Sequence, residues 1–319
     1  MEKSTLHETS CLVRFTTKFW SGIKSDKELR SQLAEDVSAQ SDLLNVQKYL
    51  VGKEHSKYFR RIINQVRNNY YYPATLPWND NSSDDEGMVV SGWRLCPNSN
   101  LDNLIAQMSQ AKREFEKEVE EFLDFYPEKI KQAKILLGDA FDAYDYPDAH
   151  HIRDKFRFEF ETNMIPNYSH DIRLNVSASA RAKIESDVTN RIQSNALSAS
   201  KAIIDSLVEQ VSHIADKVGQ YDPKDKQGGF FKDSSFDKLR QAISVLPNFN
   251  KDILGDIPSV KDAHQKLVGI MAKIDSVDSL RQDSDESASK REEVSTDLKD
   301  AIDPLKGDFL AKLGGLKND

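Results

Sequence analysis

Aspartates at three-residue intervals are the first residues of this sequence whose types and spacing could do chemistry. A fourth aspartate and two histidines follow closely, and the set is Asp139, Asp142, Asp145, Asp148, His150 and His151. On one continuous helix, Asp139 and Asp142 would share a face and, with a histidine, could hold Mg²⁺ or Mn²⁺. However, Pro147 interrupts that helix, and acids near the start of the next helix favour its dipole. The pattern therefore favours helix capping and solvation over a metal site.

Cationic and aromatic side chains are interleaved in the segment 44–72. The segment holds six lysines and arginines against one acid, Glu54, a local net charge of +5. A site for single-stranded nucleic acid requires cations along the phosphates and aromatic rings that stack on the bases. The candidate residues for binding a nucleic acid or an acidic partner are Lys53, Lys57, Arg60, Arg61, Arg67, Tyr70 and Tyr71. The alternative is a solvated helix face whose aromatic residues belong to the core. The sequence has no RNP, KH or helix-turn-helix signature, and this absence favours the alternative.

The motifs of common enzyme classes do not occur in the sequence. The pair Gly52-Lys53 is not a phosphate-binding loop, because Gln47 stands at the required upstream glycine and Glu54 follows the lysine. Neither G-x-S-x-G nor H-E-x-x-H is found, and the acidic run at 80–86 lacks the spacing of a calcium loop. The cysteines, Cys11 and Cys96, are too few for a disulfide framework or a cysteine-rich zinc site. We therefore expect no catalytic residues, metal or cofactor, and a protein that is not an enzyme.

Composition limits the class of protein further. The 319 residues allow a sizeable core, and a net charge of −8 argues against a protein that covers nucleic acid with its whole surface. No apolar run approaches the roughly 18 residues of a membrane span, and residues 1–20 lack the apolar core of a signal peptide. We expect a soluble, intracellular protein without a membrane partner.

Hydrophobic periodicity predicts a helix-dominated α+β fold. The chain divides into a mixed α/β region at 1–98, a long helical hairpin at 99–220 with a short extended insert at 156–176, and short helices with a polar tail at 221–319. The first hairpin arm would be 99–145, with a new helix starting at Pro127. The second arm would be 179–219, and the heptad-like spacing near its end leaves a coiled coil as an alternative to a plain hairpin. A small antiparallel sheet would lie at one end of the hairpin. Strands are expected at 10–20, 88–96, 156–160 and 172–176, and further helices at 25–39, 44–72, 235–246, 260–274 and 292–301.

Several short aromatic and proline-containing motifs follow one another in a characteristic order. They are residues 19–22 (FWSG), 72–78 (YPATLPW), 93–97 (WRLCP), 122–127 (FLDFYP), 137–141 (LGDAF) and 156–160 (FRFEF). In this order they resemble an uncharacterised phage and prophage family, a domain of unknown function found near MoxR-type AAA ATPases and von Willebrand A-domain proteins. The acidic insertion at 79–87 and the long polar C-terminus are departures from that family.

The resemblance implies a partner class and no catalytic residue. It leads us to expect a non-enzymatic phage interaction protein, an adaptor or accessory to an AAA ATPase and A-domain system, located in the host cytoplasm or the virion. Two alternatives remain open at this point. One is an accessory protein that binds single-stranded nucleic acid through 44–72, and the other is a virion or assembly component that forms homo-oligomers.

Overall fold

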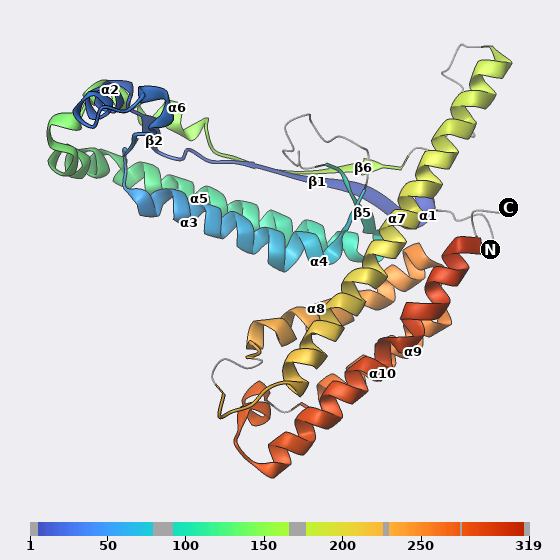
Figure 1. Ribbon diagram of the computed structural model, residues 1–319. Coiled ribbons are helices and arrows are strands. Elements are labelled where there is room, and N and C mark those ends of the chain that lie inside the picture. Colours follow the sequence, from blue (N-terminus) through green and yellow to red (C-terminus); the bar gives the residue numbers. More distant parts are fainter. Residues whose placement is uncertain (1–5, 79–91, 166–176, 226–229, 275, 316–319) are drawn as a thin grey trace. The chain divides into compact units, whose positions relative to one another are not determined.

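The computed structural model describes residues 6–78, 92–165, 177–225, 230–274 and 276–315 (Figure 1). Contacts divide the chain into two compact units, each built from separate stretches. Unit 1 comprises Met1–Arg14, Tyr72–Asn103 and Thr162–Asp319, and unit 2 comprises Phe15–Tyr71 and Leu104–Glu161. The chain is mostly helical with a small antiparallel sheet, so the predicted α+β class is confirmed. No helix in the described ranges is long and apolar enough to cross a bilayer.

Unit 2 consists of two long helices, a two-stranded sheet and short helical turns. Strand β2 (Ile23–Ser25) pairs antiparallel with β3 (Gln47–Tyr49). Its helical elements are α2 (Lys27–Asp36), η1 (Ser41–Leu43), α3 (Lys53–Val66), the π-helical η2 (Arg67–Tyr71), α5 (Asn98–Leu137) from Leu104 onward, η3 (Gly138–Ala140), η4 (Ala143–Asp145) and α6 (Ala149–Arg153).

Apolar stripes at helical spacing explain why α3 and α5 pack against a common core. On α5 the stripe comprises Leu104, Met108, Ala111, Phe115 and Val119, all of them buried. On α3 the residues at 56, 59, 63 and 66 are buried, a spacing that places them on one face. The ring of Phe59 contacts that of Phe115 edge-on, with centroids 5.8 Å apart. The burial of these side chains contributes more to the stability of the two helices than helix propensity does.

Two predicted helix boundaries in unit 2 are wrong. Residues 44–52 are not helical: they contain β3, and Gly52 has a φ of 89°, a backbone conformation that favours glycine and immediately precedes α3. Helix α5 runs through Pro127 without a break, although an interior proline costs about 3 kcal/mol. The apolar stripe continues on both sides of this proline, with Tyr126 and Ala133 buried, and their packing outweighs that cost.

Unit 1 combines most of the larger sheet with the C-terminal helices. The strands of this sheet follow the order β4-β5-β1-β6, and β1 and β6 each contribute residues to both units. The pairings β1–β5 and β4–β5 are antiparallel. The elements are α1 (Leu6–Thr9), β1 (Ser10–Lys18), α4 (Tyr72–Ala74), β4 (Leu76–Pro77), β5 (Arg94–Pro97), β6 (Arg157–Met164), α7 (Ala178–Gly219), α8 (Asp233–Phe249), η6 (Asn250–Leu254), α9 (Pro258–Ala272), η7 (Val277–Arg281) and α10 (Asp285–Gly315).

The long antiparallel helix pair of unit 1 is formed by α7 and α10 (Figure 1). Buried residues of α7, among them Leu207 and Val211, belong to one core with Leu298 and Ile302 of α10. The predicted pairing of 179–219 with the first arm, 99–145, is wrong, because an apolar stripe specifies a buried face and not the helix that covers it.

Helix α10 also begins earlier than predicted, within a stretch whose composition indicates a polar linker. The Ser284 hydroxyl accepts the backbone N–H of Ser287, and the buried Arg291 donates to the carbonyls of Leu280 and Gln282 at 2.9 and 3.2 Å. These local hydrogen bonds anchor the first turns of α10 to the preceding η7. The predicted acidic loop at 79–87, residues 88–91 of the predicted second strand and the predicted strand at 172–176 lie outside the described residues.

Candidate functional site

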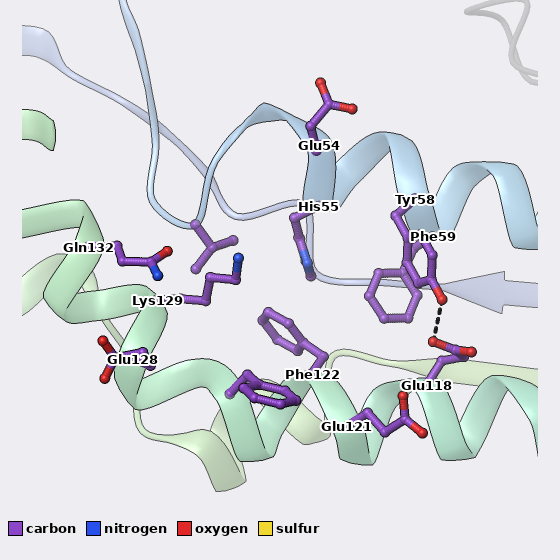
Figure 2. Close-up of a pocket in the computed structure, with 12 residues that line it drawn as sticks. Glu54, His55, Tyr58, Phe59, Glu118, Glu121, Phe122, Glu128, Lys129 and Gln132 are labelled. Atoms are coloured by element: carbon purple, nitrogen blue, oxygen red, sulfur yellow. Dashed lines mark hydrogen bonds between the residues drawn. The ribbon is translucent and has the colours of Figure 1, made fainter.

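A groove of about 520 Å³ lies between α3 and α5 in unit 2 (Figure 2). We call it the α3–α5 groove. Its walls carry aromatic rings and a set of charged side chains that come mostly from α5. The rings are His55, Tyr58, Phe59, Phe122 and Phe125, and the charged residues are Glu54, Glu118, Glu121, Glu128 and Lys129.

Aromatic rings cluster around His55 in the groove, edge-on or tilted relative to its imidazole. The imidazole lies 4.3 Å from the ring centroid of Phe122 and 5.1 Å from that of Phe59. Burial lowers the pKa of His55, partly opposed by its hydrogen bond to the Trp20 carbonyl, and the nearby charge of Lys129 lowers it further. The Nε2 atom lies 2.8 Å from that carbonyl oxygen, so Nε2 carries the proton of a neutral ring. A neutral imidazole within a cluster of aromatic rings makes the floor of the groove an apolar surface.

Tyr58 and Phe125 form the open part of the groove. The Tyr58 hydroxyl donates a hydrogen bond to a carboxylate oxygen of Glu118 (Figure 2). This bond is the main reason that the pKa of Tyr58 is raised to about 12, so the phenol keeps its proton at neutral pH. Phe125 is 65% exposed, an unusual position for a phenylalanine. It offers a ring on which a ligand can pack.

Glutamates outnumber lysines around the groove, four to one. Three of them form pairs with lysines on their own helices: Glu54 with Lys57 at 2.8 Å, Glu121 with Lys117 at 3.3 Å, and Glu128 with Lys131 at 3.1 Å. All three pairs are solvent-exposed, and such pairs contribute little to stability. A cationic ligand can therefore replace these lysines at little cost.

The basic residues predicted as a binding site are only partly brought together. Lys53, Lys57, Arg60 and Arg61 are exposed on α3, and their i, i+4, i+7, i+8 spacing places them on one face. We call these four residues the basic face of α3. Lys53 and Arg61 lie over tyrosine rings, those of Tyr49 and Tyr58, at 5.2 and 5.4 Å.

The other three predicted residues are partly or fully buried in unit 2. The guanidinium of Arg67 donates to Thr17 Oγ1 at 3.1 Å and lies 5.9 Å from the ring of Phe15. Tyr71 is 4% exposed and packs edge-on against Phe15, and Tyr70 is half-buried. Tyr71 therefore cannot stack on a base unless the core opens.

The aspartates considered for a metal site have other roles in the structure. Asp142 and Asp148 accept backbone N–H groups at the starts of η4 and α6, at 2.9 and 3.0 Å, which confirms the capping interpretation. Asp145 is buried between two lysines, with Lys48 Nζ 2.8 Å from its carboxylate and Lys24 bound to the other oxygen. In the part of the chain that the structure describes, no group of three or more potential ligands could hold a metal ion.

Unit 2 also carries most of the exposed large apolar side chains in the described chain, ten of fourteen. Three of them follow a helical spacing of i, i+4, i+8, with Leu29 and Leu33 on α2 and Val37 at its C-cap, and this apolar stripe faces solvent. Apolar surface of this kind marks sites of protein–protein contact when it is concentrated in one region. The ten residues are Leu29, Leu33, Val37, Leu43, Tyr58, Ile105, Phe125, Ile135, Leu136 and Tyr144.

The α3–α5 groove is not predicted from the sequence. Its floor joins His55 to Phe122, which lie 67 residues apart, and no spacing rule connects them. The one available signal is the aromatic run at 122–126, where a ring is left on the outer side of an otherwise regular stripe.

Comparisons of the chain with protein-family models, with curated proteins and with solved structures found no match. The resemblance to the phage family is therefore a hypothesis that depends on the order of the sequence motifs alone.

Proposed function

We propose that this protein is a non-enzymatic adaptor that binds a partner protein through unit 2. The observation that carries the proposal is the concentration of exposed apolar side chains in unit 2, together with an open groove of aromatic rings. Exposed apolar surface costs free energy in water, and covering it with a partner recovers about 25 cal/mol per Å².

The chemistry of the α3–α5 groove defines the segment that fits it. An aromatic or aliphatic side chain would pack on Phe125 and Phe122, between the two helices. A lysine or arginine beside it would displace the exposed lysine partners of Glu121 and Glu128 and take their place. The occupant is thus a protein segment with an apolar anchor next to a basic residue, a combination typical of interface hot spots.

The family resemblance supplies the partner class for this proposal. An AAA ATPase, or a von Willebrand A-domain protein that works with it, would be the bound protein, in the host cytoplasm or in the virion. Self-association through the same apolar surface is the competing outcome, and it predicts a mass in solution that increases with concentration.

The first test is an affinity purification of the tagged full-length protein from phage-infected cells, with and without nuclease. An AAA ATPase or A-domain protein that survives nuclease supports the proposal, and its affinity is then measured by titration with purified components. Phe125→Ser should weaken that binding by tenfold or more, because loss of a buried aromatic anchor costs about 2 kcal/mol. Phe230→Ser is the matched control, since Phe230 is also exposed, at 58%, and belongs to unit 1. Equal binding by wild type and Phe125→Ser would remove the groove from the proposal.

The basic face of α3 supports a second candidate function, the binding of single-stranded nucleic acid. Four exposed cations on one helical face provide positive charge for phosphates. Two of them lie over tyrosine rings, and these rings provide a surface on which a base can stack. Charge reversal at Lys57, Arg60 and Arg61 should then abolish salt-sensitive binding to a labelled oligonucleotide. The control reverses three exposed lysines of unit 1, which are Lys201, Lys251 and Lys261. An equal loss in both variants would indicate unspecific attraction and no site on α3.

A further inference from the structure

The two cysteines of the chain lie directly opposite each other on neighbouring strands of the sheet of unit 1. Strands β1 and β5 pair antiparallel, and their register places Cys11 directly opposite Cys96. Directly opposed residues in such a ladder point to the same face, with Cα atoms about 4.5 or 5.5 Å apart. Both separations lie within the range of about 4.4–6.8 Å that a disulfide spans. The strand pairing therefore places the two cysteines at a Cα separation that a disulfide can span.

The surroundings of the two thiols differ. Cys96 is 0% exposed, whereas Cys11 is half-buried and reachable from solvent. A hydrogen bond from the Cys96 thiol to the Cys11 sulfur lowers the pKa of Cys11, against burial that raises it. The same contact and burial raise the pKa of Cys96. The Cys96 sulfur also lies 3.5 Å from the carbonyl oxygen of Pro97, a second acceptor for its proton.

We propose that Cys11 and Cys96 form a reversible intramolecular disulfide when the protein meets a peroxide. The accessible Cys11 is the thiol that reacts first, and the buried Cys96 is the one that resolves it. This assigns a redox modification site to the β1–β5 pair, independent of the proposed binding function of unit 2.

The chemistry balances with hydrogen peroxide as the oxidant. The Cys11 thiolate attacks one peroxide oxygen, so that an S–O bond forms, the O–O bond breaks, and hydroxide leaves. The Cys96 sulfur then attacks the sulfur of the resulting sulfenic acid. An S–S bond forms, the S–O bond breaks, and the hydroxyl leaves as water with the thiol proton. The two thiols lose two electrons to the peroxide, and two waters are the products.

The disulfide would close a covalent loop that contains residues 12–95. A cross-link over a loop of this length reduces the freedom of the unfolded chain. The oxidised protein should therefore unfold at a higher temperature than the reduced protein, and a thiol reductant should reverse the shift. This gives a second measurement besides the mass of the product.

The test treats the reduced full-length protein with one to a few equivalents of hydrogen peroxide. Free thiols are then alkylated under denaturing conditions and the intact mass is measured. The expected product is a monomer lighter by about 2 Da, the two hydrogens lost from the thiols, with no thiol left to alkylate. Peptide mapping without reductant should give one cross-linked pair of peptides, one containing Cys11 and the other Cys96.

Two controls separate a preformed pair from chance oxidation. In Cys11→Ser, the remaining Cys96 should stay reduced and be alkylated only after unfolding, because it is buried. Wild type unfolded in urea should form the intramolecular bond more slowly than the folded protein, since the open loop lowers the effective concentration of the second thiol. Over-oxidised Cys11 beside free Cys96, a dimer linked through Cys11, an unmodified protein, or equal rates with and without urea would each overturn the proposal.

Discussion

Replacing Asp145 by asparagine would remove a buried negative charge from between two lysines of unit 2. The Asp145 side chain is 2% exposed, and Lys48, 11% exposed, has its Nζ atom 2.8 Å from the carboxylate. Loss of one partner from a buried ion pair costs about 3–5 kcal/mol, because it leaves an uncompensated charge. Asp26, whose carboxylate is 3.1 Å from the same Nζ, still neutralises part of it. Lys24 is half-exposed and adds little. We therefore expect Asp145→Asn to lower the free energy of unfolding by about 2–3 kcal/mol.

Urea denaturation, followed by circular dichroism, measures this loss. The midpoint should fall while the slope with denaturant stays unchanged, since the surface exposed on unfolding is the same. The matched control is Asp139→Asn, an exposed aspartate in the neighbouring turn, with an expected change within about 0.5 kcal/mol. In Asp145→Asn combined with Lys48→Met, the stranded cation is gone and part of the stability should return. If Asp145→Asn costs no more than Asp139→Asn, the inferred burial of the charge is refuted.

The pH dependence of the same pair has a definite sign. Burial would raise the pKa of Asp145, but hydrogen bonds from Lys24 and Lys48 outweigh it, so that the pKa lies below its ordinary value of 3.8. A carboxylate with a lowered pKa stabilises the fold above the ordinary value, and this contribution is lost as pH falls through the lower, folded-state value. The difference in stability between wild type and Asp145→Asn should therefore be full at neutral pH and shrink below about pH 4.

Four further substitutions test the packing and local geometry around these sites. Phe59→Ala should cost about 3–5 kcal/mol by leaving a cavity in the aromatic core, whereas Tyr58→Phe, at an exposed ring, should cost less than about 1 kcal/mol; urea titration compares the two, and similar losses would contradict the burial pattern. Gly22→Ala should destabilise by more than about 1 kcal/mol, because Gly22 has a φ of 64° and an added Cβ would lie 2.7 Å from a methyl of Val51; an unchanged thermal midpoint would rule this out. Ser177→Ala should remove the hydroxyl that caps α7 at a cost of about 1 kcal/mol, seen as faster hydrogen exchange in its first turn, and unchanged exchange would show that the cap is not needed.

Local patterns in the sequence were sufficient for the fold class and for most element positions. The strands predicted at 156–160 and 10–20 correspond to β6 and β1, and the longest predicted helix corresponds to α7. The capping interpretation of the aspartate run holds for Asp142 and Asp148, because it depends on residues only two or three positions apart. These features depend on near neighbours, whose spacing the chain itself specifies.

Features that need contact between distant residues were decided only by the tertiary structure. Apolar stripes identify the buried face of α7 but not α10 as its cover, because hydrophobic burial has no directional code. The same limit explains the continuity of α5 through Pro127. The local cost of a proline can be read from the sequence, whereas the packing that outweighs it cannot.

The candidate sites show the same division between sequence and structure. Composition identifies the basic segment, but only the fold shows that Arg67 is half-buried and bonded to Thr17 and that Tyr71 is buried in the core, while the four cations of α3 remain exposed. The pairing of Cys11 with Cys96 depends on the register of β1 against β5, and a shift of one residue would separate them. By itself the sequence determined which side chains are available and which local elements form. The strand register and helix packing decided which of those side chains meet, because both are set by contacts between residues far apart in the chain.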